Sequence, residues 1–133
     1  MIEKDDCDTY LFYESQKLIL ACCVGDLDAI DNCIDIYNYS LLSAIVEGKS
    51  ENHDGVFYTL QIMGYNAVAN TLMRRGIDLF ERETNNSQYS SEQLYLLFDS
   101  LMGFATCIDD TQRFEDYRNK QKETLALGFE ISK

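Results

Sequence analysis

The chain has 133 residues, 46% of them hydrophobic, and its 23 acidic and 11 basic side chains give a formal net charge of −12. This hydrophobic content excludes an intrinsically disordered chain, and the length is typical of one domain that builds its own core. We therefore expect a single domain over residues 1–133. The charge disfavours direct binding of DNA or RNA, because carboxylates repel phosphates, and it favours a basic protein as the partner.

The sequence also argues against secretion, membrane insertion and metal binding. Its start, "MIEKDDCDTY", is acidic where a secretory signal needs basic residues, and no apolar run approaches the roughly 18 residues that span a bilayer, so we expect a cytoplasmic protein. His53 is the only histidine and has no second ligand at a useful spacing, so we expect neither a metal nor another cofactor. The cysteines form no Cys-x-x-Cys motif and are expected to be reduced thiols: Cys7, Cys22, Cys23, Cys33 and Cys107.

The pattern of apolar residues in the first half of the chain predicts short helices that end at glycines. Proline is absent, and apolar residues recur at spacings of three and four, which indicates an all-α fold. The run "TYLFYESQKLILACCVG" predicts a helix that ends at Gly25, and "DLDAIDNCIDIYN" predicts a second helix with Asp26 as its N-cap. A separate run, "YSLLSAIVEGKS", ends at Gly48 and leads into a polar loop over residues 49–55.

The central segment "VFYTLQIMGYNAVANTLMRRGIDLF" predicts two helices that are separated at Gly64. Asn66 is the expected N-cap of the second helix, and Gly76 is expected to follow its last residue. On this interpretation Arg74 and Arg75 lie in the last helical turn, where cations interact favourably with the negative end of the helix dipole. The Arg pair is then a structural feature and not a functional basic patch.

Two more helices are expected in the last third of the chain. Residues 81–89, "ERETNNSQY", are polar and predict a connection. Ser90 and Gln93 have the spacing of a capping box, and a broad apolar stripe continues to Ile108. The final segment, "TQRFEDYRNKQKETLALGF", predicts an amphipathic helix that starts near Thr111.

The best candidate for a binding site is a row of acids on the second predicted helix. Asp28, Asp31 and Asp35 are spaced by three and four residues, so they share one helical face, and we expect no Lys or Arg within reach to neutralise them. Tyrosines next to acids are frequent in protein interfaces. Alternatively, the acids only solvate the outer face and the tyrosines fill the core. The expected partner-binding residues are Asp26, Asp28, Asp31, Asp35, Tyr37 and Tyr39, with the loops 49–55 and 81–89 as secondary candidates.

No catalytic signature is present. The sequence contains no Gly-rich phosphate loop and no Gly-x-Ser-x-Gly motif. The carboxylate pairs Asp109-Asp110 and Glu115-Asp116 are adjacent, so on a helix they point in different directions. We therefore expect that the protein is not an enzyme and has no catalytic residues.

Two segments with a central glycine resemble each other. "LILACCVGDLDAIDNCI" and "FYTLQIMGYNAVANTLM" each join an apolar helix to a second one through glycine, and Gly25 and Gly64 lie 39 residues apart. The segment from Phe57 to Asp78 resembles an ankyrin repeat, with Gly64 at the break and "RRGID" at its end, although the Thr-Pro-Leu-His opening is missing. The resemblance covers residues 16–88.

The resemblance implies stacked helical hairpins over residues 16–88 and a capping helix pair over residues 89–133; a generic helical bundle is the alternative. Ankyrin-like domains act by presenting a binding surface. The chain also resembles small acidic immunity proteins, which implies that it neutralises a basic toxin or defence enzyme acting on nucleic acids. The alternatives are a DNA-mimic protein, whose carboxylates imitate phosphates, and a homodimeric structural or adaptor protein.

Overall fold

A computed structural model describes residues 4–49, 54–86 and 88–132, and this part of the chain contains six helices and no strand. The side chains are described for residues 11–49, 55–86 and 88–126. The all-α prediction is confirmed for these residues. The helices are α1 (Lys4–Val24), α2 (Leu27–Val46), α3 (Asp54–Ile62), α4 (Asn66–Thr84), α5 (Ser91–Cys107) and α6 (Thr111–Ser132).

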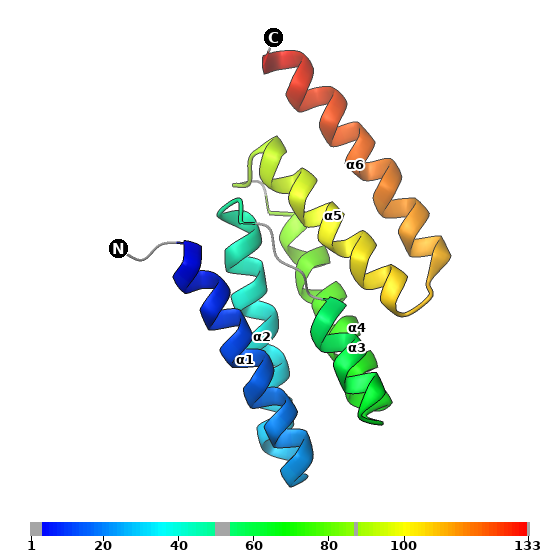
Figure 1. Cartoon of the computed structure of the whole chain (residues 1–133). Helices are drawn as coiled ribbons and strands as arrows, with labels where there is room; N and C mark the ends of the chain where they lie inside the picture. The colour runs from blue at the N-terminus through cyan, green and yellow to red at the C-terminus, as the bar shows by residue number, and fades with distance from the viewer. Residues whose placement is uncertain (1–3, 50–53, 87, 133) are drawn as a thin grey trace.

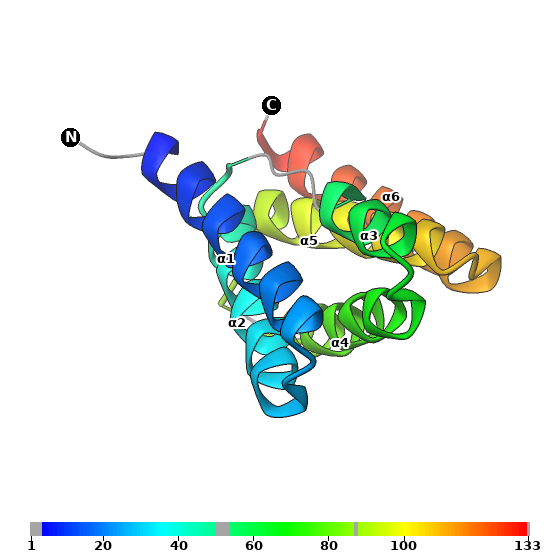
Figure 2. The same cartoon turned by 60° about the horizontal axis from the view of Figure 1, so that its bottom comes forward.

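The six helices follow one another as three hairpins (Figure 1). In Figure 1 the hairpin of α1 and α2 lies on one side and that of α5 and α6 on the other. Figure 2 shows α3 beside α5 and α4 beside α2. Helix α4 is central, because it packs against α2, α3 and α5. All six helices contribute buried apolar side chains to one cluster. Its largest fully buried members include Leu18, Ile34, Phe57, Phe80 and Phe104.

Three helix ends are set by glycine, as predicted. Gly25, Gly48 and Gly64 have φ angles of 81°, 83° and 91°, in the left-handed region that other residues rarely adopt. At Gly25 the amide of the glycine donates to Cys22 O at 3.2 Å, and the following amide donates to Ala21 O at 3.3 Å. This pair of hydrogen bonds satisfies carbonyls at the end of α1 and turns the chain directly into α2.

Four local predictions were wrong. The two runs expected after Gly25 form the single helix α2, of 20 residues, because their apolar stripes continue into each other. Gly76 does not follow α4 but lies within it, buried between α2 and α5. Arg74 and Arg75 are therefore in the middle of α4 and not in its last turn. The N-cap of α4 is Tyr65 and not Asn66.

The connections of the chain match the predictions in part. Helix α4 extends through Thr84, so it includes the start of the expected loop 81–89. Helix α3 begins at Asp54, within the expected loop 49–55; residues 50–53, with His53, lie outside the described part, as does the side chain of Cys7. Helix α6 starts at Thr111, as predicted.

The ankyrin-like arrangement is not confirmed. An ankyrin repeat has about 33 residues, whereas α1 and α2 together cover Lys4–Val46. In addition, α4 packs against both α2 and α5, while α6 packs mainly against α5. The structure thus shows a sequence of helical hairpins whose units differ in length.

The predicted capping box at the start of α5 is present. Ser90 Oγ accepts from the amide of Gln93 at 3.2 Å, and Gln93 Oε1 accepts from the amide of Ser90 at 2.9 Å. Gln93 Nε2 also donates to Val46 O at 2.9 Å, which joins α5 to the end of α2. We expect Ser90→Ala to lower the free energy of unfolding by about 1 kcal/mol in urea denaturation. Ser43→Ala, on the exposed face of α2, is the control and should leave it nearly unchanged.

Candidate protein-binding surface

Helix α2 places the predicted acidic row on the surface. Asp28, Asp31 and Asp35 are exposed on one side of the helix, while Ile34 and Leu41 on the other side are buried. Asp26 precedes them as the N-cap, and its Oδ1 accepts from the amide of Ala29 at 3.2 Å. The prediction of this cap is confirmed. Its carboxylate also suits the positive end of the α2 dipole.

The prediction that no cation neutralises the row was wrong. Arg75, from the middle of α4, donates through Nη2 to Asp31 Oδ1 at 2.5 Å and through Nη1 to Asp35 Oδ1 at 3.4 Å. The hydrogen bond to Asp31 is the main cause that raises the pKa of Arg75. The contact is formed because α4 packs along α2. This packing brings Arg75 next to aspartates that are 40 and 44 positions away in the sequence.

The row nevertheless keeps an excess of negative charge. One guanidinium is shared by two carboxylates, whose side chains are 62% exposed in Asp31 and 57% exposed in Asp35. Asp28 makes no ion pair with a described residue. Exposed pairs of this kind stabilise a fold by about 0–1 kcal/mol at most, so a second cation can share these carboxylates at low cost.

A groove of about 360 Å³ lies beside the row, between α2 and α4. Tyr39, which is 56% exposed, lines it together with Asp35 and Arg75, so the groove joins two of the predicted residues. Tyr37 is only 4% exposed and belongs to the core cluster, so it is not part of this surface. The complete lining consists of Asp35, Asn38, Tyr39, Arg75, Asp78, Leu79 and Arg82.

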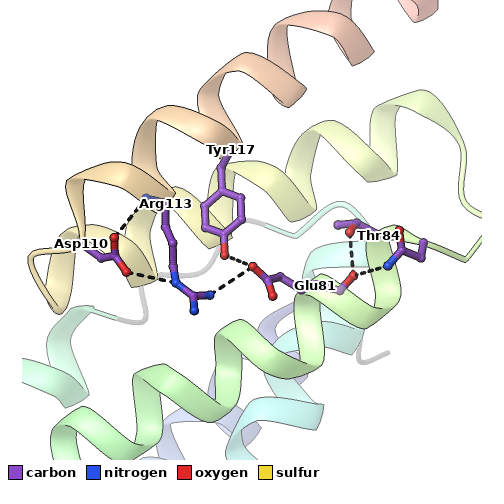
Figure 3. A network of polar contacts seen from close by, with 6 residues as sticks. Glu81, Thr84, Asp110, Arg113 and Tyr117 are labelled. Carbon is purple, nitrogen blue, oxygen red and sulfur yellow. Dashed lines mark hydrogen bonds and ion pairs between the residues drawn. The ribbon is translucent and has the colours of Figure 1, made fainter.

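A second polar cluster, which the sequence did not indicate, connects α4 to α6 (Figure 3). The Tyr117 hydroxyl and Arg113 Nη1 both donate to Glu81 Oε2, the latter at 3.2 Å. Arg113 Nε also pairs with Asp110 Oδ2 at 3.0 Å, and Asp110 Oδ1 accepts from the amide of Arg113 at 3.1 Å. Helix α6 therefore starts with a carboxylate cap that is part of the same cluster.

This cluster joins α4 to α6. Tyr117 is 4% exposed, and its burial, followed by the hydrogen bond to Glu81, raises the pKa of its hydroxyl, which remains protonated at neutral pH. The Arg113 guanidinium and the Glu81 carboxylate satisfy each other.

Two thiols of the α1–α2 hairpin, Cys22 and Cys33, are buried. Burial raises the pKa of Cys22 and of Cys33, so both stay protonated, and the thiol is a poorer nucleophile than the thiolate. Among the described residues, no three His, Cys, Asp or Glu side chains are grouped in a way that could hold a metal ion. None of the described helices is long and apolar enough to cross a bilayer.

Comparison of the chain with protein-family models, with curated proteins and with solved structures finds no match. The assignment of a site therefore depends on the residues themselves. The acidic row was found from its helical spacing, but its partner Arg75 was not. The signal for Arg75 was present, because apolar residues recur on both sides of it, at Leu72 and Leu79, and indicate that the helix continues past Gly76.

Proposed function

We propose that the chain is a protein-binding module that neutralises a basic protein, as an immunity protein or inhibitor of a toxin or defence enzyme that acts on nucleic acids. The observation that supports this most directly is the acidic row of α2, where Asp28, Asp31 and Asp35 are exposed and a single cation, Arg75, pairs with only two of them. An enzyme that binds nucleic acid needs a basic surface for the phosphates. A protein that covers this surface with carboxylates blocks access to it.

The charge of the whole chain supports the same role. A net charge of −12 attracts a basic partner over a distance and speeds association at low salt. The DNA-mimic alternative is weaker, because Arg75 and Arg82 lie among the acids of the groove and interrupt a phosphate-like array. The proposal needs no catalytic group and no cofactor.

The first test is a pull-down with the tagged chain from a lysate of the cells that produce it. We expect a basic protein to be recovered at low salt and to associate more slowly as the salt concentration is raised, because ions screen the attraction. The variant Asp28→Asn/Asp31→Asn/Asp35→Asn should slow the association of the purified partner about tenfold at low salt.

The matched control removes the same charge elsewhere. Glu92, Asp109 and Glu123 are exposed acids of the α5–α6 hairpin that make no ion pair with a described residue. The variant Glu92→Gln/Asp109→Asn/Glu123→Gln should slow association much less than the row variant. Recovery of only neutral or acidic proteins, or equal effects of the two variants, contradicts the proposal.

Neutralisation is tested separately from binding. The recovered partner is assayed on DNA and RNA, alone and with an equimolar amount of the chain. We expect the activity of the partner to be lost in its complex with the unmodified chain. The activity should be restored when the row variant replaces the unmodified chain at a concentration that does not saturate the partner. A partner that remains fully active in the complex contradicts an inhibitor and favours an adaptor protein.

A further inference from the structure

The turns at one end of the molecule carry large apolar side chains that the core does not cover. Around the turn from α1 to α2, Leu20, Val24 and Leu27 are 63%, 72% and 78% exposed. Around the turn from α3 to α4, Ile62 and Met63 are 86% and 43% exposed. We name these five residues the tip surface. Single exposed apolar residues are ordinary, but a group of this size is typical of an interaction site.

The two turns are neighbours in space. Interaction with the Cys23 side chain is the main cause that raises the pKa of Tyr65, so these two side chains lie close together. Cys23 precedes Val24, and Tyr65 follows Met63 by two residues, so the contact brings the two halves of the tip surface together. Both turns lie at the lower end of the molecule in Figure 1.

The acidic row begins at the same end. Asp26 and Asp28 flank Leu27 in the sequence, and Asp31 lies one helical turn farther along α2. An apolar area with a charged edge is the usual composition of a protein interface, in which the apolar centre contributes most of the affinity and the rim sets the approach. The row alone supplies only a rim.

We infer that the tip surface is the apolar centre of the interface, and that it binds a basic partner protein through a segment in which apolar side chains are flanked by Lys or Arg. This inference rests on the proposed function and adds to it the place and chemistry of contact. A second copy of the chain fits poorly, because pairing two tips would bring Asp26 and Asp28 of both copies together in molecules of charge −12.

The inference predicts different kinetic effects for the two kinds of residue. Loss of apolar contacts removes interactions that exist only in the complex, so it speeds dissociation. Loss of the acids weakens long-range attraction, so it slows association. A tip variant and a row variant with similar affinity are then distinguished by their rates.

The test uses two synthetic helical peptides of equal length and charge, one with Leu and Lys on adjacent faces and one with Ser in place of each Leu. Binding to the immobilised chain is followed in real time. We expect the Leu–Lys peptide to bind at least about tenfold more tightly than the Ser–Lys peptide. Leu27→Ser/Ile62→Ser should remove this difference through faster dissociation, and Val24→Ser should reduce it. Asp28→Asn/Asp31→Asn should slow the association of both peptides.

Phe12→Ser/Leu125→Ser is the control, because these residues are 66% and 36% exposed but lie outside the tip surface. Circular dichroism verifies that each variant is folded.

If the tip variant binds the Leu–Lys peptide like the unmodified chain, or if the control weakens binding equally, the tip surface is not the centre of the interface. Binding that requires the acids but not Leu27 and Ile62 overturns this inference alone, whereas failure of both peptides to bind overturns the proposed function too. A dimer that is lost in the tip variant identifies a second copy as the occupant and overturns the inference.

Discussion

We expect the substitution Gly76→Val to lower the free energy of unfolding by about 1–3 kcal/mol, because it overfills the space between α2, α4 and α5. A Cβ atom at Gly76 would lie 3.0 Å from Phe104 Cζ and 3.1 Å from Asn38 Oδ1. Neither neighbour can move away easily. Phe104 is fully buried with its ring edge-to-face on Phe80, and Asn38 is buried with its Nδ2 donating to Leu72 O at 3.1 Å.

A loss of stability on replacement of Gly76 is opposite in sign to the effect of helix propensity. Helix propensity alone favours the replacement of glycine within a helix by alanine, by about 0.5–1 kcal/mol. Urea denaturation of Gly76→Ala and Gly76→Val is compared with that of Gly55→Ala, where the added Cβ meets nothing within 4 Å. We expect Gly55→Ala to be neutral or stabilising. A Gly76→Val variant as stable as the unmodified chain would contradict the close approach of the helices.

Gly76 also lies next to a residue of the candidate binding surface. Arg75 precedes Gly76, and its contacts to Asp31 and Asp35 depend on the distance between α2 and α4. In the double variant Gly76→Ala/Phe104→Leu, the smaller side chain at position 104 should relieve part of the strain. The double variant should therefore lose less stability than the sum of the losses measured for the two single variants. The requirement for glycine at position 76 is therefore one of packing and not of backbone conformation.

The glycines show how far the sequence predicts this fold. Gly25, Gly48 and Gly64 were identified correctly as helix ends, because polar or turn-forming residues follow each of them. Gly76 was assigned in the same way and incorrectly, since a glycine required for close packing has the same appearance in a sequence. The residues that follow it, Ile77 and Phe80, continue the apolar stripe of α4 and carry the information that distinguishes the two cases.

The candidate surface was predictable only where a single helix defines it. The row Asp28, Asp31 and Asp35 follows from the helical period. Tyr37 was expected in the binding site and is buried; its position three residues after Ile34 on the apolar stripe carried that information. Contacts between helices do not follow from this period. Arg75 reaches the row, and Arg113 reaches Glu81, only because of how α4 packs against its neighbours, and local spacing contains no record of that packing.

We expect Tyr117→Phe to lower the free energy of unfolding by about 1–2 kcal/mol at neutral pH, because the charged Glu81 loses a donor that Arg113 and water replace only in part. The effect should depend on pH in one direction. Burial, and then the hydrogen bond to Glu81, raise the pKa of the folded Tyr117 hydroxyl above its ordinary value of about 10. Above about pH 10 the unfolded chain releases this proton while the folded chain retains it, so the stabilisation is complete below that pH and is lost as the pH rises.

Urea denaturation at about pH 8 and about pH 11 tests this prediction. The difference in free energy of unfolding between the unmodified chain and Tyr117→Phe should be smaller at the higher pH. Tyr39→Phe, at an exposed position, should have little effect at either pH. A difference that stays constant or grows over this range contradicts the role of the Tyr117–Glu81 contact in holding α6 against α4.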